Sequence, residues 1–231
     1  VAVSLDQNPR YGLIDARQGA INAVVEAFRN VAAVGASPQA VTDCLCFGNP
    51  EKEHQMGIFV AAIHGVADTC KAIDLKEHPG FPVPIIAGNV SLYNESKAGS
   101  IPPSPLIGCL GKLNDASKAV DISFKKTGST IIMIGDRKNE LGGSVYYDLH
   151  GELGAKLPEP DLEEVQAQLY VMIDLIDAGL VSASHDISDG GLAVALAEMS
   201  FENNIGCEVS VDSDLPFSQI LFSETGGFLI E

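Results

Sequence analysis

A short polar motif follows an apolar run in the middle of the chain. The run at 83–87 contains valine, proline and two isoleucines, and Gly88, Asn89 and Ser91 come directly after it. A glycine lets a ligand approach the backbone closely, and Asn and Ser side chains offer neutral oxygens and hydrogen bonds. We interpret the run as a strand and the motif after it as a phosphate or metal site, with an ordinary turn as the alternative.

A second polar position, Asp43, interrupts the apolar run at 40–47. A carboxylate in such a run is costly unless it is paired, hydrogen-bonded or bound to a metal ion. Asp43 is therefore a candidate ligand, and a buried capping acid is the alternative. The run opens into turn residues that include Asn49.

A third cluster, at 184–191, combines His185, Asp186 and Asp189 with a pair of glycines that begins at Gly190. We expect a strand to end at the histidine and a helix to begin after the glycines. Backbone N–H groups at the start of a helix suit an anion. For His185 the alternative is a structural histidine that is bonded to the backbone.

Several common site types are absent from the sequence. The histidines show neither His-x-His nor His-Glu-x-x-His spacing, and the glycines match neither a Rossmann nor a P-loop motif. A net charge of −17 argues against nucleic acid and against an anionic membrane surface as partners. No run reaches the ~18 apolar residues of a membrane-spanning helix. The five cysteines are irregularly spaced, which favours free thiols in a reducing cytoplasm.

The elements that must position these residues follow from hydrophobic periodicity and from the placement of Gly and Pro. Helices are expected at 16–34, 56–73, 162–176 and 192–199. Strands are expected at 40–47, 83–87, 106–113, 130–135, 181–185, 207–211 and 220–222, with a surface insertion at 74–81 and a long loop at 139–160. Alternating strands and helices predict an α/β or α+β fold with a domain boundary near 115–128.

Five motifs also occur in a fixed order, at 8–12, 42–51, 88–95, 140–144 and 185–192. Together they resemble the second half of the formylglycinamide ribonucleotide amidotransferase family, also called phosphoribosylformylglycinamidine synthases, over almost the whole chain. The resemblance implies a ligase of de novo purine biosynthesis. In that family ATP phosphorylates the amide oxygen of formylglycinamide ribonucleotide, and ammonia from a glutaminase domain or subunit displaces the phosphate.

The resemblance also implies a fold, that of the aminoimidazole ribonucleotide synthetase superfamily. Residues 1–118 are expected to form an A-type domain that lacks its first strands, and residues 119–231 a B-type α/β domain that is truncated at its end. Two such halves form a pseudo-dimer through the sheets of their A-type domains, with nucleotide in clefts between A-type and B-type domains. Because an apolar run at 227–231 ends the chain, we expect a fragment of a longer cytoplasmic enzyme.

Site residues follow from the resemblance, motif by motif. Asp43 and Gly88 resemble ATP contacts of the family, Asn89 resembles an Mg²⁺ ligand, and Ser91 resembles a substrate contact. Further positions that the resemblance marks around the clefts are Asn49, Asp186, Asp189, Gly190 and Glu224. No catalytic residue is expected in this chain, because the catalytic histidines and acidic Mg²⁺ ligands of the family belong to its first half, and the chain alone is expected to be inactive.

The sequence departs from the family pattern at Cys46, where Asn is expected, and at Ala87, where Ser or Gly is commoner. A second hypothesis makes this half a non-catalytic nucleotide-binding and structural half of the pseudo-dimer. A third is another superfamily member, such as aminoimidazole ribonucleotide synthetase, selenophosphate synthetase or thiamine-monophosphate kinase, which the runs at 47–51 and 91–95 disfavour. The expected partners are the first half of the enzyme, the glutaminase and the substrate. An isolated A-type sheet exposes an apolar face and is expected to dimerise through it.

Overall fold

The first part of the chain builds a four-stranded sheet, whose strands run in the order β1-β8-β2-β5. The computed structural model describes the whole chain, residues 1–231. β8 pairs antiparallel with β1 and β2, and β5 adds to the outer side of β2 as a parallel strand. The strands of this sheet are β1 (Ala2–Asp6), β2 (Ser37–Cys46), β5 (Ile85–Ser91) and β8 (Ser104–Lys112).

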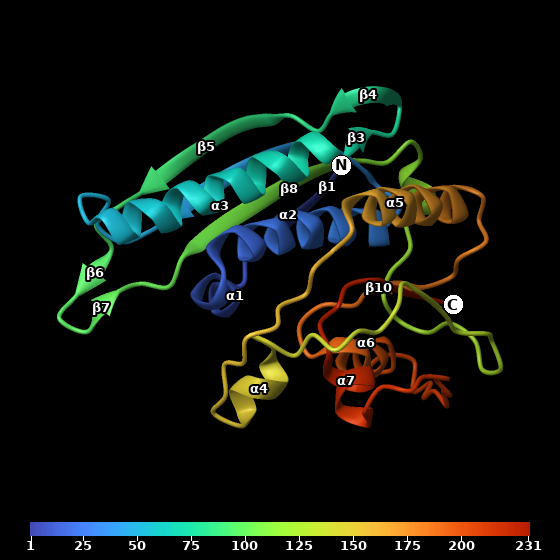
Figure 1. The fold of residues 1–231 in the computed structure, drawn as a ribbon. Coiled ribbons are helices and arrows are strands. Elements are labelled where there is room, and N and C mark those ends of the chain that lie inside the picture. The colour runs from blue at the N-terminus through green and yellow to red at the C-terminus, as the bar shows by residue number, and fades with distance from the viewer.

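Two long helices, α2 (Ala16–Ala33) and α3 (Glu53–Ala72), lie on one face of this sheet (Figure 1). Asp15 caps α2 by accepting a hydrogen bond from the backbone N–H of Gln18. Because the sheet and other helices surround α2, it is buried on nearly all sides, and its buried residues include the polar Asn22 and Arg29. The short helix α1 (Pro9–Ile14) precedes it.

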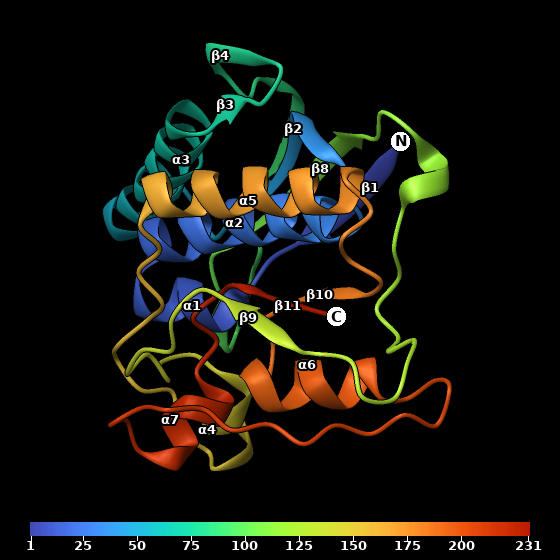
Figure 2. The same ribbon diagram turned by 90° about the vertical axis from the view of Figure 1, so that its right-hand side faces the viewer.

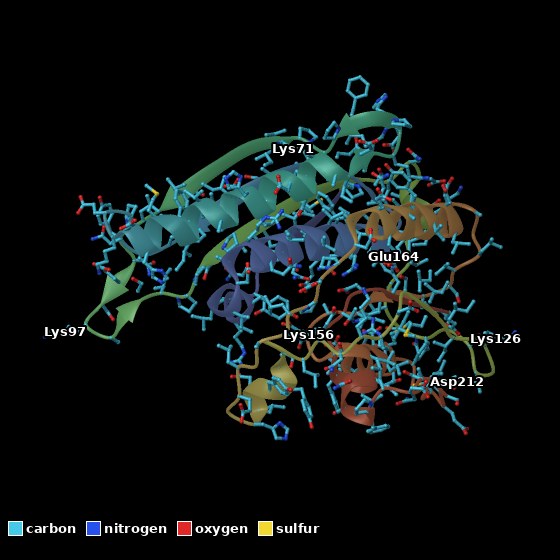
Figure 3. The ribbon with its side chains drawn as sticks, in the orientation of Figure 1. Lys71, Lys97, Lys126, Lys156, Glu164 and Asp212 are labelled. Atoms are coloured by element: carbon cyan, nitrogen blue, oxygen red, sulfur yellow. The ribbon has the colours of Figure 1, made fainter.

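The opposite face of the sheet carries no helix (Figures 1 and 2). On this open face the apolar side chains of β1 and β8 are exposed to solvent: Val3 is 66% exposed, Leu5 67% and Leu110 38%. The outer strand β5 is exposed along nearly its whole length. Two hairpins extend from the sheet, β3 (Asp74–Leu75) with β4 (His78–Pro82) and β6 (Glu95–Ser96) with β7 (Gly99–Ser100). Figure 3 shows Lys97 at the tip of the second hairpin.

The rest of the chain builds a smaller antiparallel sheet with the strand order β10-β11-β9. Figure 2 shows α5 beside α2, between the two sheets, and α6 on the far side of the small sheet. The elements of this lobe are β9 (Ile132–Ile134), α4 (Val145–Leu149), α5 (Leu162–Asp177), β10 (Ser184–Asp186), α6 (Gly191–Met199), α7 (Phe217–Phe222) and β11 (Phe228–Ile230). A 3₁₀ turn, Ala116–Lys118, lies in the connection from β8.

The two lobes share one large hydrophobic core. Buried residues of α2, the four-stranded sheet and α5 form a continuous cluster that also contains Phe228 and Ile230 of β11. Leu229, between them, points to the other side and packs in a smaller cluster with α6. Alternate side chains of β11 therefore pack into two hydrophobic clusters on opposite sides of the small sheet.

Most predicted elements are present, and four predictions need correction. The segment 207–211 has no regular structure, and 220–222 belongs to helix α7 because Phe217, Ile220 and Leu221 follow helical spacing after Pro216. The predicted loop 139–160 contains α4. The strand predicted to end at residue 87 continues to Ser91, so the polar motif lies inside β5. The segment 74–81 lies at the surface, as expected, and forms most of the β3–β4 hairpin. None of the helices combines the length and apolar character that crossing a membrane requires.

Candidate functional site

The first group of predicted site residues lies on the adjacent strands β2 and β5. Asp43 is paired in register with Gly88, and the next pairs along the strands join Cys44 with Asn89 and Cys46 with Ser91. Asp43 lies between Val41 and Leu45, which are buried against the helices, so it faces the helix side. Asn89 and Ser91 accordingly face the open side of the sheet. We call Asp43, Gly88, Asn89 and Ser91 the strand cluster.

Gly88 packs closely against the Asp43 side chain of the neighbouring strand. A Cβ atom at position 88 would lie 2.5 Å from Oδ1 of Asp43, which is far inside van der Waals contact. The Asp43 carboxylate is half-buried and accepts no hydrogen bond within the chain. Burial raises its pKa, and no neighbouring cation lowers it. The fold thus holds the Asp43 carboxylate in place but provides no hydrogen-bond donor for it.

The other members of the strand cluster are held by short turns around them. Asn94 donates hydrogen bonds to the Ser91 carbonyl at 2.7 Å and to the Ser91 hydroxyl at 3.1 Å. Asn49, in the turn after β2, accepts a hydrogen bond from the N–H of Glu51 at 2.9 Å. Asn89 is exposed and makes no side-chain hydrogen bond. Its amide oxygen is therefore free to bind a ligand.

The strand cluster fits Mg²⁺ only as part of a larger site. No group of three or more His, Cys, Asp or Glu side chains in the chain has the geometry to hold a metal ion. Mg²⁺ prefers about six oxygen ligands, commonly one or two carboxylates with phosphates and waters. Asn89 offers one amide oxygen, while Asp43 lies on the other face of the sheet. One neutral oxygen suits a metal whose remaining ligands come from a nucleotide and from outside this chain.

The second group of predicted residues meets at the junction of the two lobes. The buried Glu224 carboxylate accepts hydrogen bonds from the Tyr11 hydroxyl at 2.7 Å, the Val145 N–H at 2.8 Å and the Gly190 N–H at 2.9 Å. Gly190 has φ of +78°, a left-handed conformation that glycine adopts without strain, and it begins α6. Glu224 thereby ties α1 to two segments of the C-terminal lobe. We call Glu224 and its donors the junction network.

Acidic residues gather beside the junction network around the buried side chain of Arg29. Burial, reinforced by Asp6 and Asp189, raises the pKa of Glu26 to about 9. Burial also raises the pKa of Asp6 to about 6 and that of Asp189 above its ordinary value. Burial lowers the pKa of Arg29, while Asp186 and Glu26 oppose that change. This part of the junction holds more acidic groups than Arg29 can neutralise.

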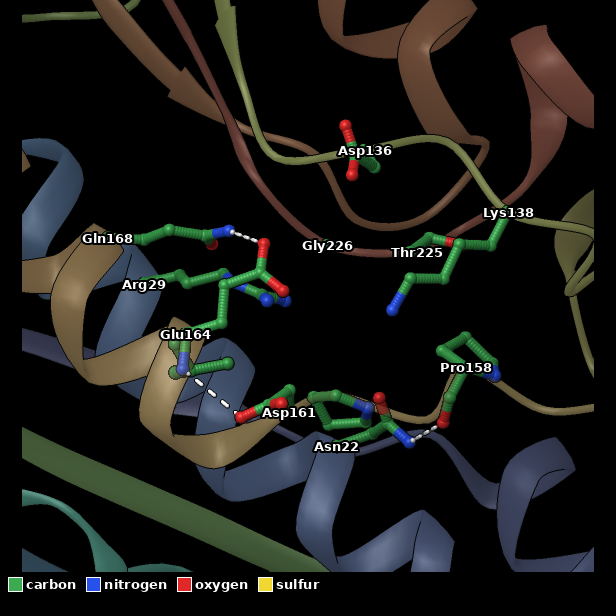
Figure 4. Close-up of a pocket in the computed structure, with 12 residues that line it drawn as sticks. Asn22, Arg29, Asp136, Lys138, Pro158, Asp161, Glu164, Gln168, Thr225 and Gly226 are labelled. Atoms are coloured by element: carbon green, nitrogen blue, oxygen red, sulfur yellow. Dashed lines mark hydrogen bonds between the residues drawn. The ribbon is translucent and has the colours of Figure 1, made fainter.

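Arg29 also lines a pocket between α2, α5 and the segment that leads to β11 (Figure 4). Lys138 extends into this pocket from the connection after β9, and Glu164 and Gln168 of α5 form its other wall. Glu164 accepts a hydrogen bond from the Gln168 amide at 2.7 Å. Asn22 closes one end by donating to the carbonyl of Pro158 at 2.9 Å. The pocket is polar and of mixed charge.

His185 has a structural role in this fold. Its Nδ1 lies 2.6 Å from the Asp186 carbonyl oxygen and its Nε2 lies 2.9 Å from the Glu198 carboxylate. Burial lowers the pKa of His185, but the hydrogen bond to Asp186 and the negative charge of Asp186 have the larger, opposite effect. Together they raise the pKa from 6.5 to about 8. Both ring nitrogens are engaged, as the structural alternative for this residue predicts.

The structure therefore separates the predicted residues into two places. The strand cluster lies on the four-stranded sheet, whereas Asp186, Asp189, Gly190 and Glu224 lie at the junction. Sequence reasoning gave no role to Tyr11, Glu26 or Arg29, which complete the junction. A signal was present, since Glu26 and Arg29 are the only charged residues of the mostly apolar stretch 20–33 and are three positions apart.

Comparisons with known proteins identify the family of both lobes. The model described as the N-terminal domain of AIR synthase related proteins matches residues 1–113, and that of the C-terminal domain matches residues 126–231. The phosphoribosylformylglycinamidine synthase subunit PurL of Methanothrix thermoacetophila is 44% identical over 234 aligned residues, which cover 100% of this chain and 30% of that protein. The chain thus spans less than a third of the length of this relative.

Solved structures show the same fold. T. maritima PurL complexed with FGAR has a TM-score of 0.78 at 21% identity, over 99% of this chain and 37% of that one. T. maritima PurL complexed with AMPPCP has a TM-score of 0.66 at 22% identity, over 99% and 32% of the two chains. The expected synthetase-like fold is confirmed. With both domain models matched in order along the chain, this chain belongs to the AIR synthase related proteins.

Proposed function

We propose that this chain is the second half of the synthetase region of an ATP-dependent amidotransferase. The whole enzyme would convert formylglycinamide ribonucleotide, glutamine-derived ammonia and ATP to formylglycinamidine ribonucleotide, ADP and phosphate. The name of the PurL relative supports this proposal, as do the FGAR and AMPPCP named with the T. maritima structures. The chain would contribute binding groups rather than the groups that transfer protons.

The observation that carries the proposal is the unsatisfied state of the strand cluster. Asp43 is half-buried without a hydrogen-bond donor, and it lies beside a glycine that keeps its carboxylate uncovered. Asn89 is exposed on the outermost strand, where an amide contributes little to packing. Polar groups that are positioned but unpaired in the fold are typical of groups that bind a ligand.

Each member of the strand cluster has a distinct proposed role. Asp43 accepts hydrogen bonds from the hydroxyl or amino groups of ATP, since a carboxylate repels phosphate. Gly88 allows the nucleotide to approach the backbone. Asn89 offers its amide oxygen to Mg²⁺, which neutralises phosphate charge when bound. The Ser91 hydroxyl donates a hydrogen bond to the ribonucleotide.

The open sheet face is the proposed contact with the first half of the enzyme. Val3, Leu5 and Leu110 expose apolar surface across β1 and β8, where a second sheet can pack. Packing there would bring groups of the first half toward Asn89 and Ser91, which lie on the same face. A glutaminase domain or subunit would supply ammonia to the assembled site. The same face explains the expected dimer of the isolated chain.

The test is the turnover of the assembled enzyme with an Asn89→Ala substitution. We expect kcat for ADP formation to fall by roughly 100-fold or more, as for loss of one group that stabilises developing charge. Asn114→Ala is the matched control, because Asn114 is exposed and makes no side-chain hydrogen bond. Equal turnover in the wild type and in Asn89→Ala would contradict the proposal.

A second candidate is a non-catalytic half that binds nucleotide for stability. It is favoured by the two cationic side chains, Arg29 and Lys138, that line one pocket at the junction (Figure 4); because this pocket, about 20 Å³, has room for roughly one water molecule, nucleotide binding there would require the lobes to move apart. If this candidate holds, Lys138→Ala weakens nucleotide binding and lowers the thermal stability gained from nucleotide, while Asn89→Ala leaves turnover unchanged. Measuring turnover and nucleotide-dependent melting in both variants separates the two candidates.

A further inference from the structure

Two thiols touch each other on the open face of the four-stranded sheet. Cys44 and Cys46 are alternate residues of β2, so their side chains point to the same side, and their Sγ atoms are 3.6 Å apart. Both are half-buried and neither is oxidised. Cys70 and Cys109 are buried on the helix side, and Cys207 is exposed in the other lobe. The pair is therefore isolated from the other cysteines.

The geometry does not favour a disulfide between these thiols. Alternate residues of a strand are about 6.6–6.8 Å apart at their Cα atoms, at the upper limit of about 6.8 Å for disulfides. The sulfurs would also have to approach to about 2.05 Å. β2 is hydrogen-bonded on both sides, to β8 and to β5, so its backbone is held against such a movement.

The same separation suits a soft metal ion. Two thiolates at about 2.3 Å from a tetrahedral cation are about 3.8 Å apart, close to the 3.6 Å between these sulfurs. We propose that Cys44 and Cys46 form a binding site for a thiophilic divalent cation such as Zn²⁺ or Cd²⁺. On binding, both S–H bonds break, two metal–sulfur bonds form and two protons pass to solvent. The two remaining tetrahedral positions stay open for water.

This site is distinct from the proposed position of Mg²⁺. Cys44 is the register neighbour of Asn89, and Cys46 is the register neighbour of Ser91. A cation on the thiols would therefore lie next to the exposed side of the strand cluster. Mg²⁺ prefers oxygen ligands and thiolates select softer ions, so the two metals do not compete for the same atoms. The thiol site does not depend on the proposed function.

The test is a titration with Cd²⁺ of the reduced protein that carries this chain, followed by the ultraviolet charge-transfer absorption of cadmium–thiolate bonds. We expect one Cd²⁺ for each Cys44–Cys46 pair, and binding that excess Mg²⁺ leaves unchanged. Cys44→Ser and Cys46→Ser should each weaken binding at least tenfold. Cys207→Ser is the matched control and should bind like the wild type.

A second measurement does not depend on how the variants fold. A thiol-counting reagent should find two fewer reactive thiols in the Cd²⁺-loaded wild type than in the metal-free protein. Absence of the absorption band, retention of binding in both Cys44→Ser and Cys46→Ser, or loss of binding in Cys207→Ser would overturn the proposal.

Discussion

The strand cluster and the junction network contain similar side chains in opposite states. The Glu224 carboxylate is buried and accepts three hydrogen bonds, from Tyr11, Val145 and Gly190. The Asp43 carboxylate is half-buried and accepts none. The Glu224 carboxylate is therefore hydrogen-bonded within the fold, whereas the Asp43 carboxylate has no hydrogen-bond donor in the chain.

This difference indicates that the junction network stabilises the fold and that the strand cluster is available to bind a ligand. A satisfied buried network holds segments together, and breaking it costs stability. An unsatisfied group at an exposed strand contributes little to stability and is available to a ligand. We therefore expect substitutions at the junction to act on folding, and substitutions in the strand cluster to act on binding.

The largest effect is expected from Glu224→Ala. This change leaves the buried Gly190 N–H, the part-buried Val145 N–H and the Tyr11 hydroxyl without an acceptor, so the free energy of unfolding should fall by roughly 3–5 kcal/mol. Tyr11→Phe removes only one of the three donors and should cost about 1–2 kcal/mol. Urea unfolding of both variants checks this order. A Glu224→Ala variant as stable as the wild type would show that the junction network does not join the lobes.

A smaller, pH-dependent effect is expected at Glu26. Its pKa in the folded protein is about 9, above the ordinary value of 4.5, so the folded state keeps a proton that the unfolded state has lost. Stability should therefore fall as pH rises between these values. Glu26→Gln mimics the protonated form. Because Glu26 keeps some solvent contact, the variant should exceed the wild type by only about 1–2 kcal/mol at pH 8.

The control for the Glu26→Gln prediction is the same stability comparison at low pH. At pH 4 the difference between Glu26→Gln and the wild type should vanish, since both the folded and unfolded wild type then carry the proton. Chemical denaturation at several pH values measures the gap. Parallel curves for the two proteins would contradict a raised pKa at this position.

Gly88→Ala should leave folding nearly intact but remove nucleotide binding. The new Cβ would meet the end of the Asp43 side chain, which can rotate, so we expect a loss of about 1 kcal/mol or less. The displaced carboxylate and the added methyl group should block the nucleotide. Calorimetric titration of the assembled enzyme checks binding. Gly57→Ala, where a Cβ meets nothing within 4 Å, is the matched control.

The smallest effect on stability is expected from Leu5→Lys on the open face. Leu5 is 67% exposed, so its loss should change the free energy of unfolding by less than about 0.5 kcal/mol. The added charge should nevertheless break self-association of the isolated chain. Light scattering should show a dimer for the wild type and a monomer for the variant. A wild type that is already monomeric would remove the basis for the proposed sheet contact.

Prediction from sequence succeeded where the signal is local. The apolar periodicity of α2, α3 and α5 gave these helices to within a few residues. Strand β5 was cut short because its exposed end carries Asn89 and Ser91 rather than apolar residues. Residues 220–222 of helix α7 were predicted as a strand because a short continuous apolar run fits either a strand or a helix.

The junction network was beyond local reasoning. Tyr11 and Glu224 are 213 positions apart, so no spacing in the sequence relates them. The charges of Glu26 and Arg29 within an apolar helix indicated a special environment, but not which partners would provide it. Such contacts follow only from how the lobes pack.

The order of strands has a consequence for how the protein is made. In each of the two larger sheets the strand that is last in the chain lies inside the sheet, β8 between β1 and β2, and β11 between β10 and β9. β1 pairs with no strand other than β8, so it has no partner until residues 107–111 have been synthesised. At about 5–20 residues per second this takes roughly 5–20 s. During synthesis each sheet therefore stays open at its centre, and it closes when its last strand arrives.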